Sequence, residues 1–109
     1  MSGFSGGGGM DFPTKPRSFV KLQAVAVSTW YTMIDESLPS LITSLTFLMS
    51  NHLTTAYYRM TVDGVVNDLI KVDNASYQVF IMAKKGFKIE IMNNGGINNT
   101  TLSVQYTVK

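Results

Sequence analysis

The sequence predicts an all-β fold, an antiparallel β-sandwich of about seven or eight strands, jelly-roll-like or immunoglobulin-like, that follows a flexible N-terminal arm. Short runs rich in Val, Ile, Thr, Tyr and Phe alternate between apolar and polar positions from Ser18 onward. Turn residues separate these runs at intervals of about eight to twelve positions, a spacing typical of sandwiches and barrels. The four glycines beyond the arm all fall at predicted turns: Gly64, Gly86, Gly95 and Gly96.

The composition is that of one globular domain. A chain of 109 residues can bury roughly two thirds of its unfolded surface, and 45% of its residues are apolar while 15% are charged. The sequence contains no cysteine, which excludes disulfides, thiolate catalysis and cysteine-based metal sites. No stretch approaches the roughly 18 apolar residues of a membrane helix, and the N-terminus lacks the regions of a signal peptide. We therefore expect a soluble protein without a membrane partner.

Residues 1–17 are predicted to form the flexible arm, and residues 18–109 the sandwich domain. Five of the nine glycines lie in the first nine residues, and two prolines follow, so this segment can bury little surface to offset its chain entropy. Phe4 and Phe12 are the arm side chains that could contact a neighbouring molecule. A disordered terminus without a binding role is favoured over such a contact.

The formal charge of +2 is concentrated near the N-terminus. Residues 1–21 contain three basic side chains and one acidic one, whereas six bases and six acids balance in the remainder. Proteins that bind nucleic acid usually carry a dense basic stripe that neutralises phosphates. We therefore expect no nucleic-acid partner.

The first half of the domain contains two ambiguous segments. Residues 19–34 form either one bent strand or two. Apolar residues in the segment 38–49 fit a helical stripe at spacings of three and four: Leu38, Leu41, Ile42, Leu45, Leu48 and Met49. The intervening serines and threonines are poor helix formers, and an alternating set also shares one strand face: Leu41, Leu45, Phe47 and Met49. A strand is therefore favoured over a helix.

Residues 55–62 alternate cleanly and predict a strand. Its expected core positions are every second residue: Ala56, Tyr58, Met60 and Val62. Asp63-Gly64 then supplies a turn, because this dipeptide tolerates positive φ angles. Residues 65–72 are expected to form a shorter strand.

Residues 77–83 and 87–92 are predicted to form a hairpin around the turn Lys84-Lys85-Gly86. In this hairpin Phe80, Met82 and Met92 belong to the outward-facing sets. The Asn- and Gly-rich segment 93–99 is a predicted loop. Residues 102–108 alternate again and close the chain as a strand.

Groups that could perform chemistry are few. His52 is the one histidine, it falls between two predicted strands, and the seven carboxylates lie mostly in turns. Asp63, Asp68 and Asp73 recur at intervals of five, but turns select aspartate and no alternating run of calcium ligands is present. We expect neither an enzyme, nor a metal site, nor a cofactor.

Two adjacent aromatic pairs, Trp30-Tyr31 and Tyr57-Tyr58, each place one ring outward if they lie in strands. Such exposed apolar surface exceeds what a soluble monomer usually carries. Burial between subunits is favoured over a small-molecule site, and a sandwich that buries both faces is the structural alternative. The predicted interface combines these rings with the hairpin and arm residues: Phe4, Phe12, Trp30, Tyr57, Phe80, Met82 and Met92.

Three stretches carry a resemblance to a known group of proteins. They are Trp-Tyr-Thr-Met-Ile at 30–34, Leu-Ile-Thr-Ser-Leu-Thr-Phe at 41–47, and Tyr-Tyr-Arg-Met-Thr-Val-Asp-Gly at 57–64, with a turn at Asn51 between the last two. Lys85 to Ile91 and the closing strand add to the pattern. Together they resemble the small β-sandwich virion proteins of tailed bacteriophages, which include capsid decoration, head-fibre and tail-attached accessory domains.

The resemblance implies a structural protein of the virion. Such a protein is often oligomeric, frequently trimeric, and attaches to a capsid or tail protein, where an extended N-terminal arm lies along neighbouring subunits. A capsid decoration or cement protein is the first expectation. The alternative is a tail-associated host-adhesion or carbohydrate-binding module that uses Trp30 or Tyr57 as a stacking platform and the loop 93–99 for sugar hydroxyls.

Overall fold

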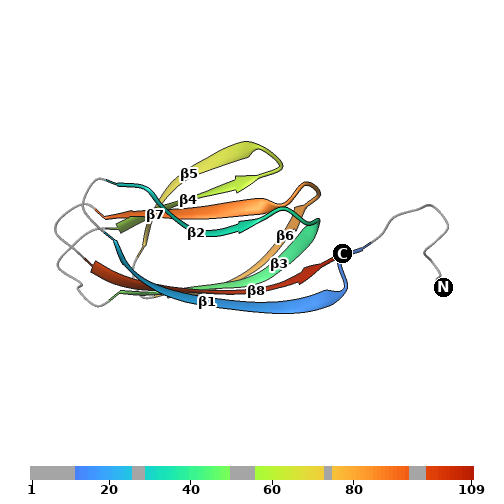
Figure 1. Ribbon diagram of the computed structural model, residues 1–109, viewed down its shortest axis with the longest axis horizontal. Coiled ribbons are helices and arrows are strands. Elements are labelled where there is room, and N and C mark those ends of the chain that lie inside the picture. Colours follow the sequence, from blue (N-terminus) through green and yellow to red (C-terminus); the bar gives the residue numbers. More distant parts are fainter. Residues whose placement is uncertain (1–11, 26–28, 50–55, 73–74, 94–97) are drawn as a thin grey trace.

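The computed structural model describes residues 12–25, 29–49, 56–72, 75–93 and 98–109, and these residues form a sandwich of two four-stranded antiparallel sheets (Figure 1). The first sheet has the order β1-β8-β3-β6 and the second the order β2-β7-β4-β5. The strands are β1 (Lys15–Val25), β2 (Tyr31–Glu36), β3 (Ser40–Met49), β4 (Ala56–Val62), β5 (Val65–Val72), β6 (Ala75–Ala83), β7 (Phe87–Asn93) and β8 (Asn98–Val108). The predicted all-β sandwich is thus confirmed.

The strand pairings identify the topology. β1 pairs with β8, β2 with β7, β3 with β6 and β4 with β5, so the chain is one long hairpin of strand pairs wrapped around a common core. Contacts of β8 with β3 and of β7 with β4 complete the two sheets. This is the arrangement of an eight-stranded jelly roll, the first of the two sandwich types that the sequence allowed.

The core lies between the sheets and is formed by inward-facing residues of both. Ring contacts connect the layers: Phe47 stacks on Tyr58 at a centroid distance of 4.7 Å, and Phe87 meets Tyr106 edge-on at 5.2 Å. Tyr58 and Met60 are buried as predicted, and Val62 packs against the core. The buried apolar residues are Met33, Ile34, Ile42, Leu45, Phe47, Tyr58, Met60, Ala83, Phe87, Ile89, Ile91, Leu102, Val104, Tyr106 and Val108.

The ambiguous segment 38–49 contains strand β3, as favoured, and a bulge explains its helix-like spacing. The register of β3 with both neighbours shifts between Ile42 and Ser44. Residues three apart normally face opposite sides of a strand, but the extra residue of a bulge lets Ile42 and Leu45 both enter the core. Leu41 was expected on the same face as Leu45 and Phe47, and this expectation is wrong. Because of the bulge, Leu41 lies opposite Thr107 and Met82 on the outer side of the sheet.

The predicted hairpin of residues 77–92 is wrong. β6 belongs to the first sheet and β7 to the second, so the turn at 84–86 crosses between the layers instead of joining neighbouring strands. Inward residues of the two strands, such as Ala83 and Phe87, therefore join the same core from different sheets. Alternation of apolar residues is the same for a hairpin and for a crossover, and this is why the sequence pattern could not separate them.

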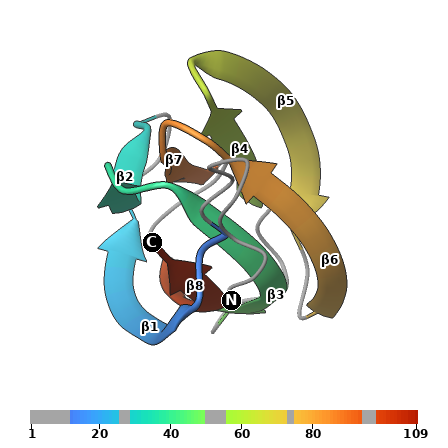
Figure 2. The ribbon, with the colours of Figure 1, turned by 90° about the vertical axis from the view of Figure 1, so that its right-hand side faces the viewer.

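The ambiguous segment 19–34 forms two strands, and they lie in different sheets. Seen from the end of the sandwich, β1 and β2 border one side and β5 and β6 border the other (Figure 2). On the first of these sides, Lys15, Arg17 and Lys21 of β1 share the inward face with Phe19, because they lie opposite buried residues of β8. The Lys21 ammonium lies 5.0 Å from the ring centroid of Tyr31 in β2 and so closes this edge.

Strand β1 begins at Lys15, three residues before the expected start of the domain. Thr14 N–H donates to the Val108 carbonyl at 3.0 Å, and the Thr107 hydroxyl donates to the Pro13 carbonyl at 2.8 Å. Pro16 is compatible with this position because an edge strand has unpaired N–H positions. The remaining arm residues before Phe12, including Phe4, lie outside the described residues.

Candidate interaction surfaces

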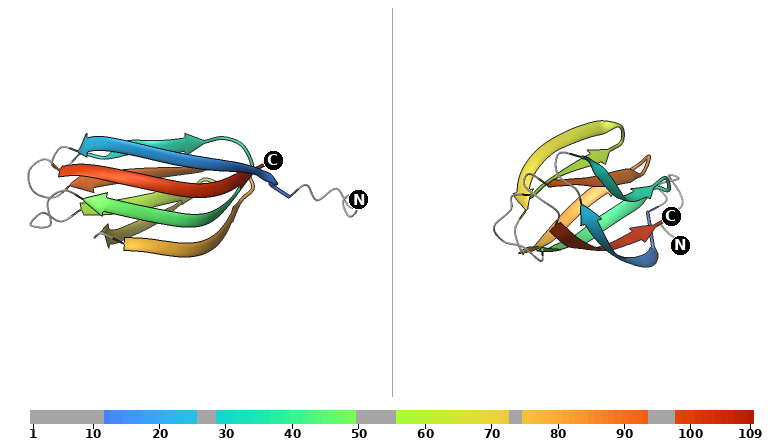
Figure 3. Two further views of the ribbon diagram at one scale, coloured as in Figure 1. Left: turned by 90° about the horizontal axis from the view of Figure 1, so that it is seen from below. Right: turned by 60° about the vertical axis from the view of Figure 1, so that its left-hand side comes forward.

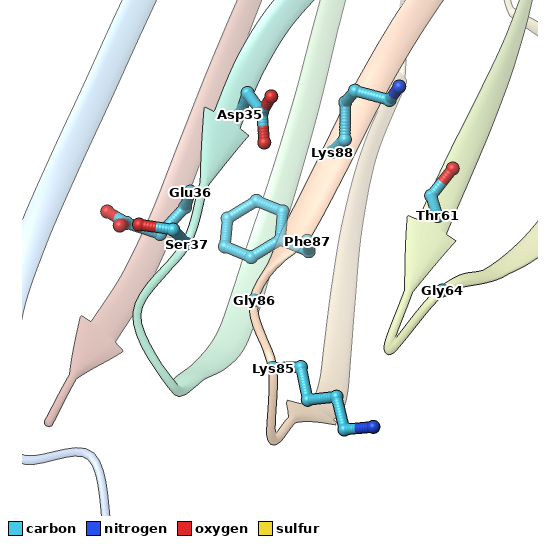
Figure 4. A pocket seen from close by; sticks show the side chains of 9 residues that line it. All are labelled: Asp35, Glu36, Ser37, Thr61, Gly64, Lys85, Gly86, Phe87 and Lys88. Atoms are coloured by element: carbon cyan, nitrogen blue, oxygen red, sulfur yellow. The ribbon is translucent and has the colours of Figure 1, made fainter.

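A shallow, open pocket of about 280 Å³ lies at the end of the sandwich where three short turns meet. The turns join β2 to β3, β4 to β5 and β6 to β7. Figure 4 shows that the side chains do not point toward a common centre: Glu36 and Lys85 point away from each other, and Asp35 lies toward Lys88. The lining residues are Asp35, Glu36, Ser37, Thr61, Gly64, Lys85, Gly86, Phe87 and Lys88.

Backbone geometry holds the turns of this pocket together. Asp63 and Gly64 have φ angles of 53° and 80°, which form the tight turn that the Asp-Gly dipeptide predicted. The Asp63 carboxylate accepts a hydrogen bond from the Lys85 N–H at 2.6 Å. Gly86 has a φ of 93°, and a Cβ there would overlap the Glu36 carbonyl oxygen. The turns are therefore interlocked, with Gly86 at the point of closest approach.

Glu36 is engaged within the fold. Its carboxylate accepts hydrogen bonds from the Tyr106 hydroxyl at 3.0 Å and from the Leu38 N–H at 3.2 Å. Burial, assisted by the hydrogen bond to Glu36 and its negative charge, raises the pKa of Tyr106 to about 12. Because both carboxylate oxygens are occupied and the lysines point outward, we assign the pocket a structural role.

The outer face of the second sheet is charged. Arg59 of β4 binds Glu90 of β7 through two hydrogen bonds of 2.8 and 3.2 Å, and the Lys88 ammonium lies 3.9 Å from the same carboxylate. The ring centroid of Trp30 lies 4.2 Å from the Arg59 guanidinium carbon. Glu90 is 8% exposed, and the hydrogen bond from Arg59 lowers its pKa against the opposing effect of burial. This face has opposite charges in contact.

The outer face of the first sheet has a different character, since none of its described residues is charged. Its four strands lie side by side in Figure 3, left. Cross-strand register with buried partners fixes which residues point outward. We call this surface the neutral face; it consists of the even-numbered residues 16–24 and 76–82, the odd-numbered residues 99–107, and Leu41, Thr43, Ser44, Thr46 and Leu48.

Hydroxyl and amide groups occupy the middle of the neutral face, and apolar groups lie around them. Gln105 donates to the Ser18 hydroxyl at 2.9 Å, and the hydroxyls of Thr46 and Ser76 are 3.1 Å apart. Several apolar side chains are more than half exposed, at 66% for Val20, 66% for Leu22, 52% for Leu48 and 77% for Phe80. An uncharged surface with these exposed side chains is a candidate for contact with another protein surface.

The structure divides the predicted interface residues between opposite faces. Tyr57 and Met92 are register partners on the outer face of the second sheet, and Trp30 joins them through Arg59. Phe80 and Met82 lie on the neutral face, and Phe12 is 48% exposed just before β1. Phe4 lies outside the described residues. These side chains therefore do not form one continuous surface.

The described residues contain neither a cluster of metal ligands nor a membrane-spanning helix. Among them, no three His, Cys, Asp or Glu side chains gather as metal ligands would, and no helix is long and apolar enough to cross a bilayer. His52, Asp73 and residues 94–97 of the predicted loop lie outside the described part of the chain. The neutral face was missed because strand order was needed to find it, although the uncharged alternate positions of 16–24 and 99–107 are visible in the sequence.

No protein family model matches the chain, and no curated protein sequence matches it. What the protein does is therefore inferred from the surfaces described above.

Proposed function

We propose that the protein is a non-enzymatic structural component of a bacteriophage virion, a capsid decoration or cement protein that oligomerises and attaches to a larger viral lattice. The neutral face is the observation that carries this proposal. A four-stranded surface whose described residues carry no charge, with Val20, Leu22 and Phe80 more than half exposed, is suited to burial against protein. The jelly roll is a fold of viral capsid domains and also of lectins, so the fold supports the proposal without selecting it.

The rigid frame also suits a structural role. Both sheets are joined by aromatic contacts across the core, and the interlocked turns fix one end of the sandwich. Strand β1 starts at Lys15 and is anchored along β8. Residues 1–11 therefore precede a firmly held strand, which is an arrangement that lets a terminal segment reach a neighbouring subunit without disturbing the domain.

The first test is attachment to particles. Phage particles purified from the organism that encodes the chain should contain the protein at a fixed copy number relative to the major capsid protein, as measured by quantitative mass spectrometry. Deletion of residues 1–11 should leave the thermal unfolding midpoint unchanged, because the hydrogen bonds that hold the segment before β1 come from Pro13 and Thr14, and should remove the protein from the particles. Purified particles without the protein would contradict the proposal.

A second candidate function is a tail-associated module that binds carbohydrate for host adhesion. The observation in its favour is that Trp30 and Tyr57 lie on the same outer face as Arg59 and Glu90, so aromatic surface and hydrogen-bonding groups are close together. Sugars commonly stack on aromatic rings beside such groups.

A glycan array separates this candidate from the first. If the protein is a carbohydrate-binding module, reproducible binding should be lost in Trp30→Ala or Tyr57→Ala and retained in Phe80→Ala, which removes an aromatic ring from the opposite face. An array on which the wild-type protein binds no glycan would exclude this candidate and leave the structural role.

A further inference from the structure

We propose that the neutral face is the site at which a second copy of this chain binds, sheet against sheet, to form a two-fold symmetric dimer. This inference specifies the oligomer that the proposed structural role requires, and it can fail without that role failing. The two outer faces of the sandwich differ in charge. The outer face of the second sheet carries Arg59, Lys88 and Glu90, whereas the described residues of the neutral face carry no charge.

Neutrality makes this face complementary to itself. When a surface packs against the same surface of a second copy, each residue near the axis meets itself or a close neighbour. A charged face would then bring like charges together, at a cost of several kcal/mol for juxtaposed like charges. A charged partner of another kind would lose hydration on this face without gaining an opposite charge. A second neutral face avoids both costs.

The polar groups of the face are able to bond to copies of themselves. Ser18, Gln105, Thr46 and Ser76 already pair across strands within one copy. Hydroxyl and amide groups each offer both donors and acceptors, so each copy can supply what the other needs. Burial of these groups between two copies therefore does not require unpaired hydrogen-bonding atoms.

The dimensions are also appropriate for a dimer. Four strands about 4.8 Å apart, with roughly ten residues each at about 3.3 Å per residue, give a face of roughly 600 Å², which approaches the ~800 Å² per partner of a standard stable interface. Val20 and Leu22 at one border and Phe80 at the opposite border are 66%, 66% and 77% exposed. These side chains would supply the apolar contacts that such an interface buries.

Contact between identical faces closes at two copies. The expected assembly unit is therefore a dimer, in place of the trimer that the resemblance to virion proteins implies. Larger assemblies would be built from such dimers through other surfaces, which leaves the charged face of the second sheet available.

The test is the mass of the full-length protein in solution. Sedimentation equilibrium of the wild type should give twice the chain mass of 12.0 kDa. Ser103→Lys, in the middle of the neutral face on β8, should raise the dimer dissociation constant by about 100-fold or more through like-charge repulsion near the axis. Thr32→Lys is the matched control, because it adds the same charge to the other face, opposite Glu90.

A second variant distinguishes loss of the dimer from loss of the fold. Val20→Lys changes an exposed residue of an edge strand, where the core is not touched, and it should dissociate the dimer as Ser103→Lys does while circular dichroism stays unchanged. A wild type that sediments as a monomer or trimer would overturn the inference, and so would a dimer that both lysine variants leave intact. Attachment to particles is measured separately, so its outcome decides the proposed function independently.

Discussion

Gly86→Ala is expected to lower the free energy of unfolding by about 3 to 4 kcal/mol. Part of this loss, about 1 to 2 kcal/mol, comes from a positive φ angle for a residue with a Cβ, since Gly86 has a φ of 93°. The remainder comes from steric overlap, because the new Cβ would overlap the Glu36 carbonyl oxygen and lie 2.9 Å from Ser37 Cα. Urea denaturation followed by Trp30 fluorescence measures the change at one fixed protein concentration.

Gly64→Ala is the matched control for this substitution. Gly64 also has a positive φ, 80°, but a Cβ there would have no atom within 4 Å. Gly64→Ala should therefore lower the free energy of unfolding only through the backbone conformation, by about 1 kcal/mol. Equal losses for the two variants would show that the contact of Gly86 with the β2–β3 turn does not matter.

Arg59→Met should cost about 2 to 3 kcal/mol at neutral pH. The substitution leaves the Glu90 carboxylate, whose side chain is 10% exposed, without its main partner, and breaking one side of a buried ion pair is more damaging than removing both sides. Lys88, 3.9 Å away, compensates only in part. The double variant Arg59→Met/Glu90→Met should recover most of the loss, which a double-mutant cycle of unfolding free energies would measure.

The Arg59–Glu90 pair also predicts that the stabilities of the wild type and of Arg59→Met change in opposite directions with pH. In the wild type the pKa of Glu90 lies below its ordinary value of 4.5, so its stabilisation is present above pH 4.5 and is lost as the pH falls through the lowered pKa. In Arg59→Met, burial without the arginine should raise the pKa of Glu90 above its ordinary value. That variant should therefore gain stability relative to the wild type as the pH falls from 7 toward 4, and a constant difference would contradict this explanation.

Sequence pattern alone predicted the class of fold and most strands, because alternation and turn residues are local properties. The segment 65–72 and the Asp63-Gly64 turn follow directly from such signals. The sequence also favoured a strand over a helix in 38–49, yet it could not reveal the bulge near Thr43 that produces the spacing of three between Ile42 and Leu45. A bulge depends on how neighbouring strands pair, which is not encoded in one segment.

The sequence did not predict which distant segments pair in one sheet or which of their residues share a face. The turn at 84–86 has the residues of a hairpin turn, but tertiary packing places its two strands in different layers. For the same reason, Trp30 and Phe80 were expected on one surface and lie on opposite faces. The neutral face depends on four strands that come together only in the folded sheet, although each strand's outward residues could be read in advance.

The basic residues of β1 have a consequence for how the protein can assemble. An edge strand with free backbone groups is a template on which another chain can add a strand, and repeated addition leads to fibres. Lys15, Arg17 and Lys21 face inward along the border between β1 and β2, and Lys21 lies over Tyr31. An incoming strand would have to bury these ammonium and guanidinium groups, so the sheets are protected from lateral growth at this border. Copies of the chain that associate as proposed would meet through their faces instead, where association ends at a defined number of subunits.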